Sequence, residues 1–207
     1  MRPFLALLAA TVLLAPTTSA QERSGPKKNL AFPEAIEVAK KNVEQEKLGA
    51  AIAALQAAIK DLQKKQRALV LASLPKPEGW TIQDQEPDEQ ADALGAGLLG
   101  VGSSTTRRYR KDGAEMNVEI TANSPLMQML GMMFNNPALV EADGGEIVRY
   151  GAHKAILKKN GDDGQELMLL MHDTHLIKVT STNVTSDDLL RVFDQAFVDR
   201  LEKPLGK

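Results

Sequence analysis

The chain has 207 residues, no cysteine and a formal net charge of −2, from 25 basic and 27 acidic residues. This near-neutral balance argues against a nucleic-acid-binding protein, which needs a net basic surface to contact the phosphates. Without cysteine there is no disulfide framework, so packing alone has to stabilise the core. The length suits one ordinary domain with an additional segment.

Residues 1–20 have the pattern of a cleaved export signal. Arg2 precedes an apolar run from Phe4 to Leu14, which is too short to span a bilayer, and residues 18–20 are the small side chains expected at a cleavage site. We therefore expect cleavage after Ala20 and a mature chain that is periplasmic or secreted. No later segment reaches the ~18 apolar residues of a membrane helix, so we expect no integral span.

Residues 21–32 are polar and are predicted to be a flexible lead. Residues 33–74 consist almost entirely of good helix formers, and Pro33 suits a first helical turn. Within this segment, six leucine or isoleucine residues and one glutamine alternate four and three residues apart, as on the buried face of a packed or coiled-coil helix. They are Leu48, Ile52, Leu55, Ile59, Leu62, Gln66 and Leu69. Because Val43 is out of phase with this row, we predict two antiparallel helices joined near residues 45–48. One bent helix is the alternative.

The predicted helical hairpin has two roles that the sequence leaves open. Ala51, Ala54 and Ala58 would let its helices approach closely, and the pair resembles one unit of a tetratricopeptide repeat, without a second copy. Short amphipathic helices usually pack on their own domain, which is the simpler interpretation. The other role is self-association or the binding of a protein partner.

A proline-rich hinge at residues 75–80 follows the hairpin. Pro75 and Pro77 cannot continue a helix, Gly79 gives backbone freedom, and Trp80 is the only tryptophan. We expect this connector to be stiff and to anchor Trp80 in a second domain, residues 81–207.

Two loops are predicted next. Residues 83–92 carry five carboxylates and are expected to be an exposed acidic loop. Residues 95–102 are glycine-rich and spell G-x-G-x-x-G, but they lack the preceding strand and following helix of a nucleotide site. We instead expect an apolar loop whose Leu98 and Leu99 contact a partner or an apolar ligand.

The Asp112-Gly113 pair predicts a two-residue hairpin turn, and residues 114–121 alternate as a half-buried strand does. Pairing across this turn sets Arg107 opposite Val118, on the apolar face. An inward arginine either extends its charge to the rim or binds a buried anion or carboxylate. We favour the rim, and retain Arg107 as a candidate contact residue.

The remaining chain predicts a methionine-rich helix after Ser124-Pro125, four strands and a closing helix capped by Thr185. The run at residues 167–171 is apolar throughout, which indicates a central strand covered on both faces. The predicted fold class is therefore α+β: an N-terminal helical hairpin, then an antiparallel sheet of about six strands packed with helices.

Several features of residues 75–201 resemble known exported proteins. This part of the chain looks like the α+β domain of uncharacterised exported bacterial proteins, a domain of the PsbP-like or lipoprotein-carrier-like kind. Four features carry the resemblance: the Gly79-Trp80 entry, the Asp112-Gly113 strand pair, the strand at 176–179 and the helix start at 186–190. The resemblance implies a sheet-plus-helix domain without a fixed catalytic set.

Two groups of residues are candidates for metal chemistry. If Asp173-Thr174 is a two-residue turn, His172 and His175 form a cross-strand pair that could hold Zn²⁺ or Cu²⁺, although a solvated hairpin tip is the simpler interpretation. On a helix Met129, Met132 and Met133 share a face, which suits Cu(I), core packing or an apolar partner surface.

No nucleophile set, Gly-x-Ser-x-Gly or His-Glu-x-x-His motif is present. We therefore predict an exported, non-enzymatic binding or interaction protein without a cofactor. Its contacts would be the glycine-rich apolar loop and the methionine-rich helix. The alternative is a periplasmic copper- or zinc-handling protein.

Overall fold

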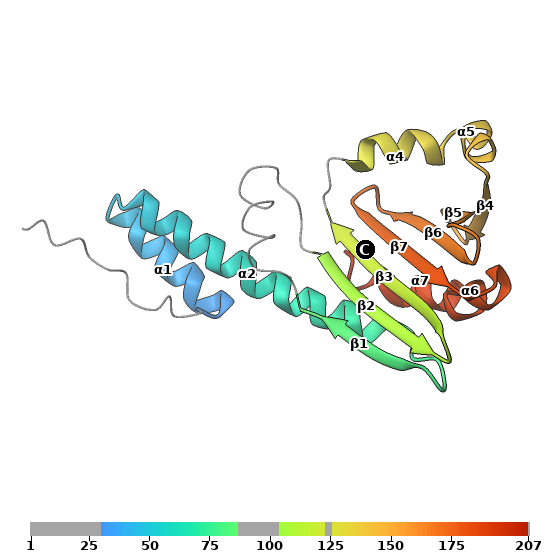
Figure 1. Ribbon diagram of the computed structural model, residues 1–207. Coiled ribbons are helices and arrows are strands. Elements are labelled where there is room, and N and C mark those ends of the chain that lie inside the picture. Colours follow the sequence, from blue (N-terminus) through green and yellow to red (C-terminus); the bar gives the residue numbers. More distant parts are fainter. Residues whose placement is uncertain (1–29, 87–103, 123–125, 207) are drawn as a thin grey trace, which may run out of the picture.

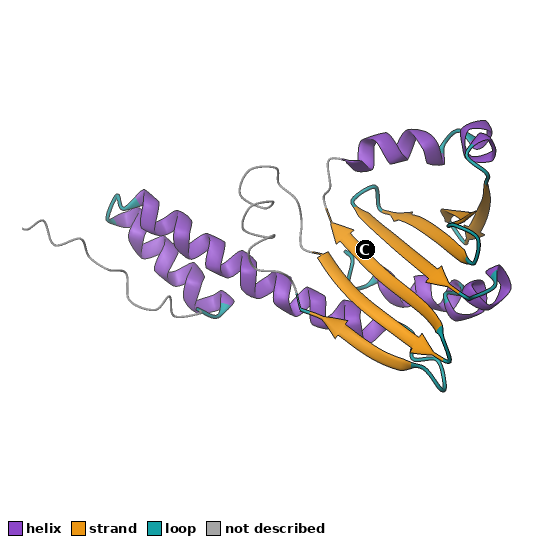
Figure 2. Cartoon of the chain, viewed as in Figure 1, coloured by secondary structure: helices purple, strands orange, loops and turns teal. Residues whose placement is uncertain are grey.

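The computed structural model describes residues 30–86, 104–122 and 126–206, and these confirm the predicted α+β fold class (Figure 1). Two helices are followed by a seven-stranded antiparallel sheet with the order β1-β2-β3-β7-β6-β5-β4. Further helices cover parts of the sheet (Figure 2). Within the described ranges, none of the helices has the length and apolar character needed to cross a membrane.

The helices and strands have the following bounds. The helices are α1 (Phe32–Glu44), α2 (Leu48–Ser73), α4 (Leu126–Phe134), α5 (Pro137–Ala142), α6 (Ser186–Val192) and α7 (Gln195–Glu202). The strands are β1 (Thr81–Gln85), β2 (Ser104–Lys111), β3 (Ala114–Ala122), β4 (Gly145–Tyr150), β5 (His153–Lys159), β6 (Gly164–Met171) and β7 (His175–Thr182).

The first two helices form a hairpin, as predicted, and not one bent helix. The chain reverses between them at Glu46, which has a left-handed φ of 57°, and the Lys47 amide donates to the Asn42 carbonyl at 2.8 Å. Apart from Val70 near the end of α2, the buried residues of both helices are alanines, each at most 5 % exposed: Ala35, Ala39, Ala51, Ala54 and Ala58. Alanine ends at Cβ, so the two helices can approach each other closely along this face.

Only the last turns of α2 pack on the α+β domain. Val70 and Leu74 are 2 % exposed and belong to the main core. The Gln66 side-chain amide donates to the Pro204 carbonyl at 3.0 Å, and Arg200 Nε donates to the Ser73 carbonyl at 3.1 Å. Figure 1 shows α1 and the N-terminal half of α2 extending beyond the sheet. The hairpin is therefore attached at one end and free of the sheet at the other.

The hinge is held by more than its tryptophan. Trp80 is partly buried against the main core, whereas Leu74 is almost fully buried. The Tyr109 hydroxyl donates to the Pro75 carbonyl at 3.0 Å, which joins the hinge to β2. Because the connector has three anchors, Trp80 carries only part of the attachment that we expected of it.

The sheet has one strand more than the six predicted. The additional strand is β1, which includes residues 83–85 of the predicted acidic loop and pairs antiparallel with β2. The prediction of a loop was wrong for these residues, because backbone pairing with β2 stabilises a polar edge strand. Ile82 lies opposite Tyr109 and Asp84 opposite Arg107, so both point to the face of the main core.

Two apolar cores lie on opposite faces of the sheet. The main core contains Tyr109, Leu169, Phe193 and other buried residues, and is covered by α6, α7 and the end of α2. The smaller core joins Phe134 and Val140 of α4 and α5 to strands β5 and β6. Successive residues of β6 point to the two cores in turn, which explains why its apolar run is continuous.

Gly164 begins β6 where there is no space for a side chain. A Cβ there would meet the backbone carbonyl oxygens of Asn160 and Ser181, which cannot rotate away. We expect Gly164→Ala to lower the free energy of unfolding by about 1–3 kcal/mol, the usual cost of overpacking. Urea denaturation would measure this.

The matched control is Gly131→Ala in α4, where an added Cβ meets nothing within 4 Å. Alanine should leave stability unchanged there, or raise it by about 0.5–1 kcal/mol, since it is the better helix former. Equal losses in the two variants would contradict the steric explanation.

Candidate functional site

The seven-position row predicted on α2 faces solvent. Its large aliphatic members, which we call the α2 stripe, are exposed as follows: Leu48 61 %, Ile52 57 %, Leu55 44 %, Ile59 54 %, Leu62 45 % and Leu69 60 %. The seventh position, Gln66, contacts the domain through Pro204. The contact between α1 and α2 uses the neighbouring alanine face, so the larger apolar face of α2 is left uncovered by the described part of the chain.

An open apolar groove adjoins the stripe, between α1 and α2. It is lined by Ile36, Ala39 and Val43 of α1 and by Leu55 of α2, with Lys40 and Glu44 at its margin. Val43 is itself 54 % exposed. The uncovered apolar surface therefore continues from α2 onto α1.

Among the methionines of α4 whose side chains are described, one is exposed and two are buried or partly buried. Met132 is 68 % exposed, but Met133 is partly buried against the smaller core and Met127 is 5 % exposed. The side chain of Met129 lies outside the described residues. Within the described part of α4, Met132 and Met133 thus have different surroundings, and only Met132 is available for a partner. The loop at 95–102, with Leu98 and Leu99, also lies outside the described residues.

Arg107 is a buried partner of a carboxylate, so the preferred prediction of a rim arginine was wrong. Its side chain is only 5 % exposed. Its Nε donates to Asp84 Oδ1 at 2.6 Å and its Nη2 donates to Asp84 Oδ2 at 3.0 Å. This two-point contact matches the planar guanidinium to the carboxylate and is among the stronger kinds of ion pair.

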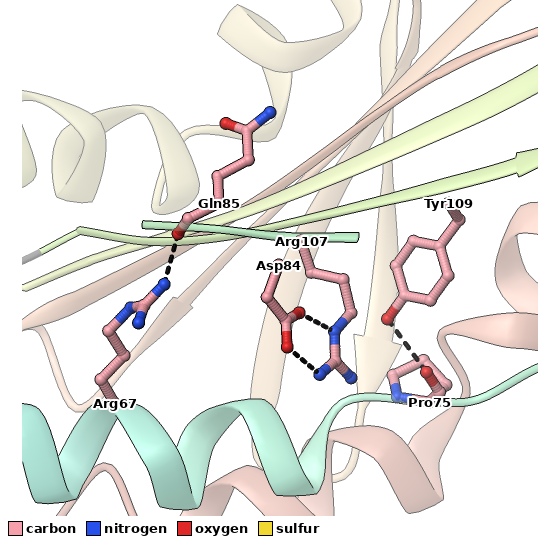
Figure 3. A network of polar contacts seen from close by, with 6 residues as sticks. All are labelled: Arg67, Pro75, Asp84, Gln85, Arg107 and Tyr109. Carbon is pink, nitrogen blue, oxygen red and sulfur yellow. Dashed lines mark hydrogen bonds and ion pairs between the residues drawn. The ribbon is translucent and has the colours of Figure 1, made fainter. Parts of the chain in front are cut away.

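The Arg107–Asp84 pair lies in a polar layer between α2 and the sheet edge (Figure 3). Arg67 extends from α2 and donates to the Gln85 carbonyl, next to Asp84 in β1. Tyr109 lies on the other side of Arg107 and donates to Pro75. These contacts attach α2 and the hinge to the first two strands, which indicates a structural role for the layer.

The electrostatics of this layer follow from its pairing and burial. The hydrogen bond from Arg107 holds the pKa of Asp84 below its ordinary value of 3.8. Burial raises the pKa of Tyr109 to about 12, against a smaller opposing effect of Arg107. Tyr109 is therefore a neutral hydrogen-bond donor at physiological pH, and Asp84 is ionised.

The histidines are arranged differently from the predicted cross-strand pair. Met171, and not His172, lies opposite His175, because His172 and Asp173 both have left-handed φ and form the turn. The expected register was therefore wrong. His175 is buried, and this burial lowers its pKa.

His172 instead meets His153 at a carboxylate of α7. Their Nε2 atoms lie 3.0 and 2.5 Å from the two oxygens of Glu202, and the rings pack edge to face at 5.6 Å. Within the described ranges, no three His, Cys, Asp or Glu side chains form a group suited to a metal ion. The three-residue contact joins α7 to strand β5 and the β6–β7 turn.

Sequence reasoning missed the role of Asp84. It was treated as one of several loop carboxylates, although it is two residues from Ile82 and four from Trp80, on the same side of an extended segment. That spacing was the available signal. It would have placed Asp84 on the apolar face, where a paired arginine is expected.

Comparison with known proteins gives no family assignment. No family model matches the chain, and no curated protein does. The extracellular domain of PknH from Mycobacterium tuberculosis is a distant structural match, with 11 % sequence identity and a TM-score of 0.30. The match covers 68 % of this chain and 91 % of that domain. The resemblance to PsbP-like and lipoprotein-carrier-like domains stays a prediction from sequence.

Proposed function

We propose that this chain is an exported, non-enzymatic interaction protein that binds another polypeptide through the α2 stripe. The observation that carries the proposal is a row of six large aliphatic side chains, each 44 to 61 % exposed, of which the five from Leu48 to Leu62 are uninterrupted. Single exposed apolar residues are normal on soluble proteins, but a contiguous apolar surface is typical of an interaction site.

Covering the stripe would supply much of the free energy that association needs. Full burial of one leucine or isoleucine contributes about 1.5–3 kcal/mol, so covering six half-exposed side chains contributes about 5–9 kcal/mol. A partner that buries a similar surface of its own adds a similar amount. The total exceeds the lower estimates of the cost of association, about 4–15 kcal/mol.

Within its described residues, the α+β domain offers a partner or an apolar ligand fewer large exposed apolar side chains than α2 does. Phe134, Val140, Ile156 and Met168 fill the space between the sheet and helices α4 and α5. Exposed Met132 is a second, smaller contact in our proposal, and Leu98 and Leu99 remain part of it on sequence grounds.

The test is a comparison of binding by three proteins. The mature chain expected after cleavage, residues 21–207, would be immobilised and exposed to the exported proteins of its source. We expect Ile52→Glu/Ile59→Glu to lose a polypeptide that the wild type binds, and Met132→Glu to lose less or none. Identical binding by the wild type and the stripe variant would overturn the proposal.

A further inference from the structure

We propose that the polypeptide bound by the α2 stripe is a second copy of this chain, with the two α2 helices side by side and parallel. This inference rests on the proposed function and names the partner. The stripe has the pattern of a two-stranded coiled coil, in which a and d positions alternate three and four residues apart. Ile52 and Ile59 are at a, and Leu48, Leu55, Leu62 and Leu69 are at d.

The choice of side chains favours two parallel strands. β-branched isoleucine at a with leucine at d packs best in a parallel dimer, whereas other combinations favour three or four strands. Gln66 is at the third a position, where a polar residue limits register and oligomeric state. Its amide already contacts Pro204, so the fully free part of the seam is Leu48 to Leu62.

The charges beside the seam suit an identical copy. A two-fold interface brings every residue near the same surface of its partner, so like charges at its margins would repel. The flanking positions from 49 to 63 are uncharged: Gly49, Gln56 and Gln63 on one side and Ala51 and Ala58 on the other. The charged residues Lys60, Asp61 and Lys64 are at the outer b, c and f positions. No charge of α2 along this length opposes self-pairing. The charged residues of α1 at the adjoining groove, Lys40 and Glu44, are of opposite sign.

The rest of the fold leaves room for this dimer. Helix α1 packs on Ala51, Ala54 and Ala58, beside the seam and not over it. Because α1 and the attachment at Leu74 already hold α2 as a helix, pairing requires little ordering of the chain. The exposed Val43 of α1, 54 % exposed, borders the same surface and can contribute to it. In the parallel arrangement both α+β domains lie at the same end of the coiled coil.

The first experiment measures oligomeric state by sedimentation equilibrium on the mature chain. We expect the wild type to be a dimer, Ile52→Glu/Ile59→Glu to be a monomer, and Met132→Glu to remain a dimer. The stripe residues are exposed in one chain, so the double variant should keep its helical content by circular dichroism. A monomeric wild type at its highest soluble concentration, or a dimeric double variant, would overturn the inference.

The second experiment fixes the direction of pairing. Because the chain has no cysteine, Leu48→Cys and Leu62→Cys can each be oxidised without competing bonds. In a parallel dimer each variant forms a disulfide with its own copy, because d packs against d. An antiparallel pair instead packs a against d, so Leu48→Cys mixed with a third variant, Ile59→Cys, tests it. Crosslinking only in that mixture would overturn the parallel arrangement.

These outcomes separate the inference from the proposed function. If the wild type is monomeric but the stripe variant loses a different polypeptide, the interaction role stands and the self-pairing does not. If the stripe variant changes neither binding nor oligomeric state, both are wrong.

Discussion

Asp84→Ala is expected to lower the free energy of unfolding by about 3 kcal/mol, because it leaves the buried guanidinium of Arg107 without its counter-charge. Loss of one member of a buried ion pair usually costs about 3–5 kcal/mol. We take the lower end because the Asp84 side chain is 37 % exposed and that of Arg107 only 5 %. Chemical denaturation of the two proteins would measure the difference.

The double variant Asp84→Leu/Arg107→Met is the control for this interpretation. Replacement of both charges by apolar side chains leaves no unpaired group, so its stability should lie closer to the wild type than that of Asp84→Ala. A double variant less stable than Asp84→Ala would show that the unpaired charge is not the source of the loss.

The same pair predicts a dependence on pH. The hydrogen bond from Arg107 lowers the folded-state pKa of Asp84 below 3.8. A lowered carboxylate pKa stabilises the folded state above the unfolded pKa, and that stabilisation is lost as the pH falls through the folded value. The double variant should therefore lose less stability than the wild type as the pH falls below about 4. An equal loss of unfolding free energy in the wild type and the double variant as the pH falls would contradict this assignment.

Phe193→Ala is expected to cost about 3–5 kcal/mol of stability, the range for truncation of a buried aromatic side chain. Phe193 is fully buried. Its ring meets those of Tyr109 and Phe197 edge to face, at 6.0 and 5.2 Å between centroids. Removal of the ring would leave a cavity where the turn between α6 and α7 meets the sheet. The amide hydrogens of these two helices should therefore exchange faster than those of the sheet. Thermal denaturation and hydrogen exchange would detect both effects.

Leu139→Ala in α5 is the matched control. Leu139 is 52 % exposed, so its truncation should change stability by no more than about 0.5 kcal/mol. Similar losses from Leu139→Ala and Phe193→Ala would mean that the aromatic contacts add little and that the main core does not depend on them.

Local sequence determined much of the fold, because the signals were contained within short stretches. The Asp112-Gly113 turn predicted the pairing of Arg107 with Val118, and this pair is present. The apolar run in β6 predicted burial on both faces. Thr185 was predicted as a helix cap, and its hydroxyl accepts the Asp188 amide at 3.2 Å. Turn chemistry and alternation are properties of neighbouring residues, so they can be recognised without the fold.

The errors concern residues whose environment comes from distant parts of the chain. Strand β1 has few apolar residues, and its pairing with β2 is what makes it a strand. Arg107 was expected at the rim because its partner, Asp84, is 23 residues away. The His172 register depended on two left-handed residues in a turn that lacks glycine, and the local sequence gives no strong preference for that conformation.

The α2 stripe shows the same division most clearly. Its spacing alone determined that Leu48, Ile52, Leu55, Ile59 and Leu62 share one face of a helix. The sequence also predicted the close approach of the helices at Ala51, Ala54 and Ala58, which are buried. Only the tertiary structure decided that the α+β domain contacts the last turns of α2 and leaves the five large side chains exposed. Periodicity specifies which side chains lie together, whereas burial depends on the surface opposite them. That surface is supplied by another element, by solvent or, in our proposal, by a second copy of the chain.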